Sequence, residues 1–232
     1  MVKTIYQYGT LGMLMEGLLE GTKPLAEILA HGNFGIGTLD SLDGEMTILD
    51  GIAYQGKSDG RLVRLTGKEK VPYGAITDFS SDTHFSFHEE KKLSEIKVGL
   101  EEHIQSKNLF AAVKIHGHFK QMTIRIMPKQ TPPYKHLIDI PQLEFKKQEI
   151  AGTIVGLYTP SLFQGVAKGG FHLHFIDDAR TFTGHVIDCI MENGTVEIST
   201  AASLAVQLPE TSDFLAADLD YTNLEKEIEQ AE

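Results

Sequence analysis

The most constraining feature of this chain is a segment at residues 171–175 that reads Phe-His-Leu-His-Phe, with a third histidine, His185, shortly after it. Successive side chains of a strand point to opposite faces, so His172 and His174 share one face of such a strand. Residues 177–180, Asp-Asp-Ala-Arg, have the composition of a turn. If the strands on either side pair as a hairpin, His185 comes beside His174 across the ladder. The pattern therefore predicts a β-hairpin with three imidazoles on one face.

Three neutral imidazoles that converge in this way are the donor set of a catalytic zinc site, which leaves a fourth position for water or substrate. Structural zinc sites usually have four ligands and are rich in thiolates, whereas this chain has one cysteine. His172, His174 and His185 are therefore the predicted metal ligands. His116 and His118 have the same spacing but no third histidine at hairpin distance, so we interpret them as surface histidines that bind no metal.

Composition excludes several classes of partner. No apolar stretch among the 232 residues approaches the roughly 20 needed to cross a bilayer, and the N-terminus has no secretory signal, so we expect no membrane partner. Cys189 cannot form an internal disulfide, which favours a cytoplasmic protein. The net charge of −11 argues against nucleic acid. An anionic substrate would need local positive charge in the site, which Zn²⁺ and a nearby arginine can supply.

Short strands and tight turns dominate the first part of the chain, where Asp-Gly pairs, a strong hairpin signal, stand at residues 43–44, 50–51 and 59–60. Residues 93–106 have the apolar spacing of an amphipathic helix. Residues 109–127 alternate like a strand, with a turn expected near Gly117 or at residues 120–121.

A proline-rich segment gives the predicted boundary between two halves of the chain. Three prolines stand within residues 128–134, and this composition is typical of a linker or crossover. We therefore expect an N-terminal α+β half, residues 1–127. The C-terminal half, residues 128–232, is expected to be rich in strands and to carry the histidine hairpin.

The hairpin and its surroundings resemble the zinc hairpin of the α-acetolactate decarboxylases, on residues 169–175 and 184–186. Further motifs follow the order of that family along nearly the whole chain. They are residues 6–8, 37–38, 42–46, 53–55, 125, 128–130, 133–134, 152–153, 158–160, 206–209 and 213–214. Because so many motifs are collinear, the resemblance is far more specific than the histidines alone.

The resemblance implies an α+β fold of two related halves with mixed or antiparallel sheets, a metal site between them, and a homodimer. It implies a zinc enzyme that converts 2-acetolactate to acetoin and carbon dioxide. His172, His174 and His185 are the metal ligands under this resemblance. Two rivals remain open. One is a metal-containing binding module of the PPC class, which shares the histidine hairpin but lacks the N-terminal half. The other is a zinc hydrolase that uses a metal-bound hydroxide.

The resemblance also implies roles outside the hairpin. The family's glutamate after an Asp-Gly turn falls on Glu45, and its arginine before Pro-Lys-Gln falls on Arg125, which we place with Thr38 at the substrate. On the residues alone, Glu45 would be an exposed turn residue and Arg125 a surface charge. A second catalytic glutamate near the C-terminus is matched best by Glu232. Competing placements for it are Glu225, Glu227 and Glu229.

These groups suit the loss of carbon dioxide from an anionic 2-hydroxy-3-oxo acid. The electron pair left behind must be delocalised into the ketone as an enediolate, and a zinc ion that keeps its full charge on three neutral ligands can stabilise it. Arg125 can orient a carboxylate or an oxyanion through its planar fork. Glu45, Glu232 or a water held by Arg125 can deliver the proton that completes the reaction.

Overall fold

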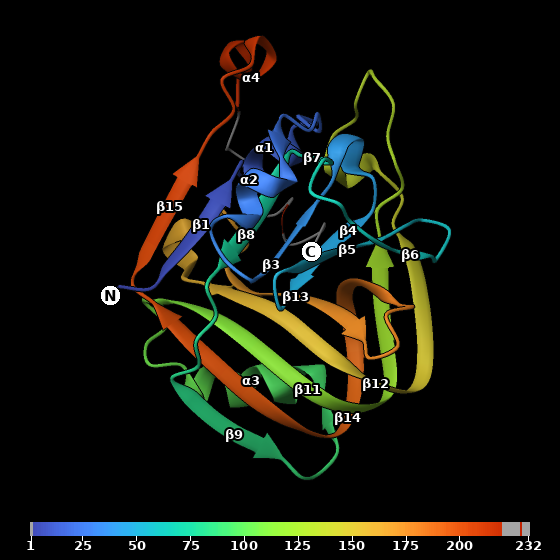
Figure 1. The fold of residues 1–232 in the computed structure, drawn as a ribbon, viewed down its shortest axis with the longest axis vertical. Helices are drawn as coiled ribbons and strands as arrows, with labels where there is room; N and C mark the ends of the chain where they lie inside the picture. The colour runs from blue at the N-terminus through green and yellow to red at the C-terminus, as the bar shows by residue number, and fades with distance from the viewer. Residues whose placement is uncertain (1, 220–227, 229–232) are drawn as a thin grey trace.

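Two β-sheets packed face to face form the body of the protein in the computed structural model, which describes residues 2–219 and residue 228 (Figure 1). The first sheet has the order β15 (Ser203–Gln207), β1 (Thr4–Tyr8), β8 (Tyr73–Thr77), β3 (Phe34–Thr38), β4 (Glu45–Leu49), β5 (Ile52–Gly56) and β6 (Leu62–Arg64). It is a mixed sheet, because β15 pairs parallel to β1 and the other neighbours are antiparallel.

The second sheet is antiparallel and has the order β10 (Lys91–Lys92), β14 (Thr183–Ala201), β11 (Phe110–Ile126), β12 (Leu143–Thr159) and β13 (Gly170–Asp177), with β9 (Thr83–Phe87) paired to β14. A small ladder joins β2 (Lys23–Pro24) to β7 (Lys70–Val71). The described helices are short apart from α3. They are α1 (Leu11–Met15), α2 (Leu25–Leu29), α3 (Leu93–His103) and α4 (Ser212–Ala216), with 3₁₀ turns η1 (Asp40–Leu42), η2 (Leu137–Asp139) and η3 (Ser161–Phe163).

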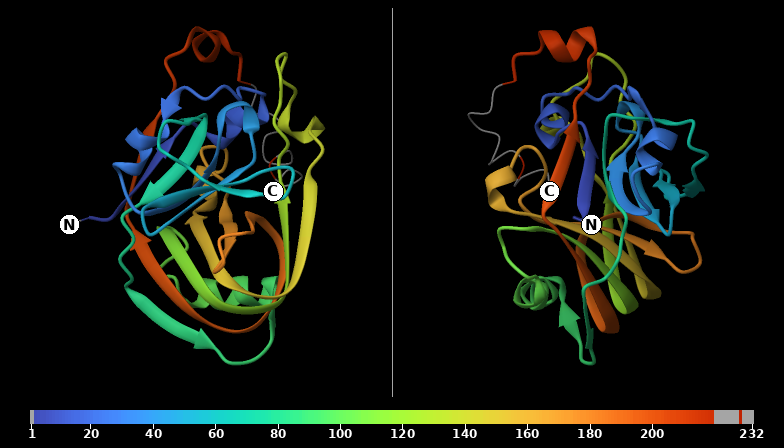
Figure 2. Two further views of the ribbon diagram at one scale, coloured as in Figure 1. Left: turned by 45° about the vertical axis from the view of Figure 1, so that its right-hand side comes forward. Right: turned by 60° about the vertical axis from the view of Figure 1, so that its left-hand side comes forward.

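The second sheet curls until its ends meet, because β14 pairs with β13 as well as with β11 (Figure 2). A row of glycines crosses three of its strands: Gly117 of β11 pairs with Gly152 of β12 and with Gly194 of β14. A Cβ on Gly117 would lie 2.2 Å from the carbonyl oxygen of Asn193, so only glycine permits this close approach of the backbones. The glycine row thus allows the three long strands to approach closely at this point.

The space between the sheets is filled by apolar side chains of both. One cluster joins Phe34 and Ile36 of the first sheet to Val155 and Leu157 of the second. The far side of the second sheet is covered by α3, whose buried Leu93, Ile96 and Leu100 pack against it. The surface between the sheets is therefore apolar except where the functional side chains stand.

The predicted α+β fold, with mixed sheets and few helices, is confirmed. The turn expected near Gly117 or residues 120–121 is wrong, because β11 continues through both positions. Its alternation is interrupted there by register shifts around Phe119 that change the pattern without reversing the chain. No described helix is both long and apolar enough to span a membrane.

Sheet membership does not follow the order of the chain. β11, which ends before residue 128, belongs to the second sheet, and β15, near the C-terminus, belongs to the first. Each sheet thus takes strands from both sides of the proline-rich segment. The division into domains at residues 1–127 and 128–232 stays a prediction.

Candidate active site

The histidine hairpin forms as its sequence predicts. His174 of β13 and His185 of β14 are direct partners across the ladder. The turn that joins the two strands is fixed by Asp177, whose carboxylate accepts hydrogen bonds from the backbone amides of Thr181, at 2.6 Å, and Phe182, at 2.8 Å. The alternate side chains of β13, Phe171, Leu173 and Phe175, lie in the core on the other face of the sheet. Because side chains alternate along a strand, the histidines lie on the face toward the first sheet.

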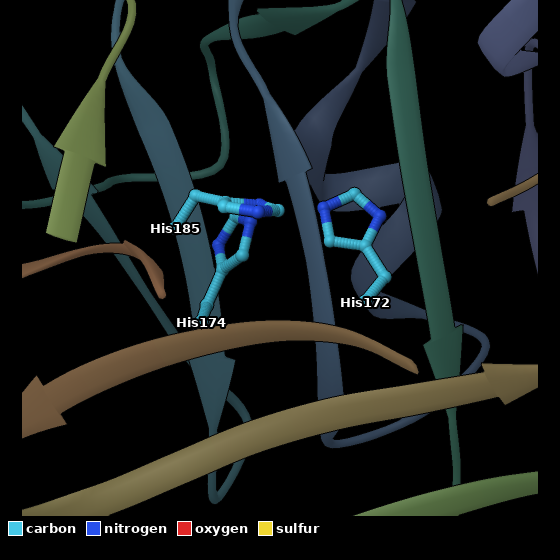
Figure 3. Close-up of side chains that lie close together, drawn as sticks. All are labelled: His172, His174 and His185. Atoms are coloured by element: carbon cyan, nitrogen blue, oxygen red, sulfur yellow. The ribbon is translucent and has the colours of Figure 1, made fainter. Parts of the chain in front are cut away.

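The three imidazoles converge (Figure 3). The centres of the His172 and His185 rings are 4.9 Å apart, and those of His174 and His185 are 5.6 Å apart. One nitrogen from each of the three rings lies within 4.8 Å of the others. The side chains are buried, with His172 at 8%, His174 at 1% and His185 at 2% exposed. Nitrogens this close, on rings that the backbone holds in place, form a preorganised set of donors.

Burial favours the neutral form of His172 and His185. Burial is the main cause that lowers the pKa of His172 well below 6.5, and the charge of Lys168 adds to it. Burial also lowers the pKa of His185 well below 6.5, with Arg125 as the largest charged contributor. Neutral imidazole is the form that binds a metal. Three buried and convergent imidazoles, two of which burial keeps neutral, therefore fit a divalent ion such as zinc, whose bonds to nitrogen are about 2.0–2.1 Å long.

Glu45 and Arg125 meet at the triad from different sheets. Oε2 of Glu45, the first residue of β4, lies 3.6 Å from Nε2 of His174. Its Oε1 lies 4.0 Å from Nη1 of Arg125. Arg125, on β11, is the direct cross-strand partner of His185 on β14. Both side chains are buried, with Glu45 at 6% and Arg125 at 3% exposed, so the sequence-only interpretations as an exposed turn residue and a surface charge are wrong.

The turn before Glu45 is held by close contacts. The hydroxyl of Thr38 donates a 2.7 Å hydrogen bond to the carbonyl of Gly44, and Thr38 is the cross-strand partner of Glu45. Gly44 has a φ of 80°, and a Cβ there would lie 2.0 Å from the carbonyl oxygen of Gly56. Only glycine fits, which explains the Asp-Gly-Glu sequence at this point. Thr38, predicted at the substrate, thus lines the site and also orders the turn that presents Glu45.

A pocket opens on these side chains. Its polar wall consists of Thr38, Glu45, Arg125, His172 and His174. The rest of the lining, its apolar wall, consists mainly of Leu11, Leu14, Leu42, Tyr73, Met127 and Leu137. The two contrasting kinds of lining suit a small molecule that carries both oxygen atoms and alkyl groups.

Two residues near the site were not predicted. One is Thr47, a fully buried residue of β4, whose hydroxyl oxygen lies 3.4 Å from Nδ1 of His174. Ile228, 1% exposed, belongs to the same apolar cluster as Leu11 and Leu14. The spacing of Thr47 two residues after Glu45 was the available signal for the first, whereas nothing local marks Ile228. Glu232 and its three competitors lie outside the described residues.

Comparison of the sequence with known proteins identifies one family over nearly the whole chain. Residues 5–221 match the family model of alpha-acetolactate decarboxylase. The chain is 43% identical to the alpha-acetolactate decarboxylase of Lactococcus lactis subsp. cremoris, over 100% of this chain and 99% of that protein. It is 36% identical to that of Bacillus subtilis strain 168, over 100% of this chain and 91% of the relative.

Solved structures agree as well. A Staphylococcus aureus protein described as similar to alpha-acetolactate decarboxylase superposes with a TM-score of 0.96 and 44% identity, covering 99% of this chain and 100% of that one. The Bacillus subtilis alpha-acetolactate decarboxylase gives a TM-score of 0.96 at 36% identity and covers 99% of each chain. Sequence and fold therefore agree over the full length, and the chain belongs to the alpha-acetolactate decarboxylase family of carboxy-lyases.

Proposed function

We propose that this protein decarboxylates 2-acetolactate to acetoin and carbon dioxide, with Zn²⁺ held by His172, His174 and His185. The family supports the reaction. The observation that carries the proposal is the buried triad, of which His172 and His174 line one pocket with Glu45 and Arg125. An ion held by these three histidines would supply Lewis-acid chemistry that stabilises the negative charge developing on the substrate.

Arg125 is proposed to bind and orient the anionic substrate. Its guanidinium lies in the polar wall of the pocket and is 3% exposed, so its charge acts in a medium of low dielectric constant. Holding the carboxylate equally tightly in the ground state and the transition state would not raise turnover. We therefore assign Arg125 to orientation, with its planar fork directed at the carboxylate or at the oxygen on which charge develops.

Glu45 is proposed to hold the proton that completes the reaction and to deliver it to the substrate. Loss of carbon dioxide breaks one carbon–carbon bond, and its electron pair stays on the substrate as an enediolate. That carbon must then take up one proton to give acetoin. Glu45 is the acidic side chain among the described residues that line the pocket. Its carboxyl group also lies 3.6 Å from His174, at the centre of the proposed chemistry, where a proton can be held and delivered.

Acetoin formation from racemic 2-acetolactate tests the proposal. We expect activity to be lost after chelation and to return with Zn²⁺, and we expect His172→Ala to be inactive. His118→Ala is the matched control, because His118 lies on β11 beside Glu192 and outside the pocket, and it should keep full activity. Acetoin formation that survives both metal removal and His172→Ala would overturn the metal-dependent reaction.

We also propose that the protein is a homodimer and acts in the cytoplasm. The family resemblance supports the dimer, and the free, buried Cys189 fits a reducing compartment. Light scattering coupled to size-exclusion chromatography measures the mass in solution. A mass of about 26 kDa, that of one chain of 25.7 kDa, would contradict the dimer.

A further inference from the structure

Thr47 lies between the two sheets, where it contacts one of the three histidines. It stands on β4 two residues after Glu45, so both side chains point toward the second sheet. The intervening Met46 and the following Ile48 pack in a separate cluster on the opposite face. The Thr47 hydroxyl lies 3.4 Å from Nδ1 of His174 and 2.9 Å from the hydroxyl of Thr183. Thr47 is thus the point at which the first sheet touches the back of the His174 ring.

These contacts determine which nitrogen of His174 is available to a metal. Nδ1 faces Thr47, while Nε2 faces the pocket and lies 3.6 Å from Glu45. A metal binds the nitrogen that carries no proton, and the other nitrogen of a neutral imidazole carries it. The ligand atom is therefore Nε2, and the proton belongs on Nδ1, where the hydroxyl oxygen of Thr47 can accept a hydrogen bond from it.

With the proton on Nδ1, His174 donates a hydrogen bond to Oγ1 of Thr47. The hydroxyl of Thr47 is then free to donate to Oγ1 of Thr183. Thr47 is fully buried and Thr183 is 1% exposed, so neither hydroxyl has water as an alternative partner. A buried polar group left without a hydrogen bond is costly, so the Nδ1–H that metal binding at Nε2 requires needs an acceptor, and Thr47 supplies it.

We propose that Thr47 is a positioning residue, which holds His174 in the tautomer and orientation that present Nε2 to the metal. This inference rests on the proposed metal centre. Partners of this kind fix the ring of a metal-binding histidine and raise its basicity, and their loss typically weakens metal binding about 10- to 100-fold. A buried threonine that served only to pack would be replaced by valine at no cost in metal affinity, because the two side chains have nearly the same shape.

The test is the affinity for Zn²⁺ and Co²⁺ alone, measured on metal-stripped protein by competition with a coloured chelator. Thr47→Val removes the hydroxyl and keeps the shape, and we expect it to bind both ions about 10- to 100-fold more weakly. Thr47→Ser keeps the hydroxyl and should restore most of the affinity. Thr77→Val is the matched control, because Thr77 is a buried threonine of the same sheet whose hydroxyl bonds to the carbonyl of Thr4. It should bind the metals like the wild type.

The visible spectrum of the Co²⁺ form provides a second measurement, which should change in Thr47→Val and not in Thr77→Val. Nitrogen NMR of the zinc form of the wild type, which needs no variant to fold, should show the proton of His174 on Nδ1. Equal affinity of Thr47→Val and wild type, or equal weakening by Val and Ser, would overturn the inference. Because no substrate is present, a protein that makes no acetoin but shows this dependence on Thr47 would refute the proposed reaction alone.

Discussion

Oε2 of Glu45 lies 3.6 Å from Nε2 of His174, so a carboxylate from one sheet reaches the ring of a histidine from the other. The two residues belong to β4 and β13, and their side chains are 6% and 1% exposed. The proposed reaction needs a proton-carrying group beside a metal. This contact places the Glu45 carboxylate beside one of the three proposed metal ligands.

Glu45→Gln should lower kcat by about 100-fold or more and leave metal content nearly unchanged. The amide has the size of the carboxyl group but cannot deliver a proton, and general acid catalysis typically contributes about 10²- to 10⁴-fold. Acetoin assays and metal analysis on the same preparation measure both quantities. Glu192→Gln, on the outer surface beside His118, is the control. Parallel losses of turnover and zinc would show that Glu45 is structural.

Arg125→Lys should raise KM and lower kcat/KM by about 10- to 100-fold, because a lysine keeps the charge but loses the planar pair of donors. Arg125 is 3% exposed, so a small change of geometry has no water to compensate for it. Steady-state kinetics with 2-acetolactate measure the effect. An unchanged KM would remove Arg125 from substrate binding.

Leu14→Ala should change which substrates the pocket accepts. Leu14 lies in the apolar wall of the pocket, and shortening its side chain enlarges the pocket. The homologue of the substrate with ethyl in place of methyl should gain about 10-fold in kcat/KM relative to 2-acetolactate, the scale of one methylene in an apolar pocket. Leu100→Ala is the control, since Leu100 is equally buried beneath the second sheet. Both variants should lose about 2–5 kcal/mol of stability. An equal shift of substrate selectivity in Leu100→Ala would show that the apolar wall of the pocket does not determine this selectivity.

The metal-free protein should lose stability as the pH falls below about 6.5. Burial lowers the pKa of His172 and His185 well below 6.5, so over that range the unfolded chain binds protons that the folded chain does not. The free energy of unfolding is therefore retained above this pH. It decreases as the pH falls toward the pKa values that the two histidines have in the folded protein. Urea denaturation at pH 7.5 and pH 5.5 measures it. His172→Asn should show a shallower dependence, and equal stability of the wild type at both pH values would contradict the expectation.

Local pattern was enough to predict the histidine hairpin. Alternation placed His172 and His174 on one face, and the turn at Asp177 set the distance to His185, all within a short segment. The positions of Glu45 and Arg125 came from the family resemblance. Taken alone, an Asp-Gly-Glu turn and an alternating strand contain no information about which distant strand lies opposite them.

What depends on contacts between distant segments could not be predicted. The glycine row at Gly117, Gly152 and Gly194 becomes visible only when three strands are aligned, so a single glycine in β11 was interpreted as a turn. The parallel pairing of β15 with β1 joins the two ends of the chain and leaves no local signal. Thr47 is an ordinary strand residue until the two sheets are packed together.

Arg125, His185 and His174 occupy one row across three adjacent strands, β11, β14 and β13. Backbone hydrogen bonds set their separation at about 4.8 Å per strand, whatever the length of the connections outside the sheet. Lengthening or shortening the loop at residues 127–136 should therefore leave this row intact. One extra residue inserted in β14 just before His185 would turn its imidazole to the opposite face, and a single error of register would thus dismantle a centre that tolerates large changes elsewhere.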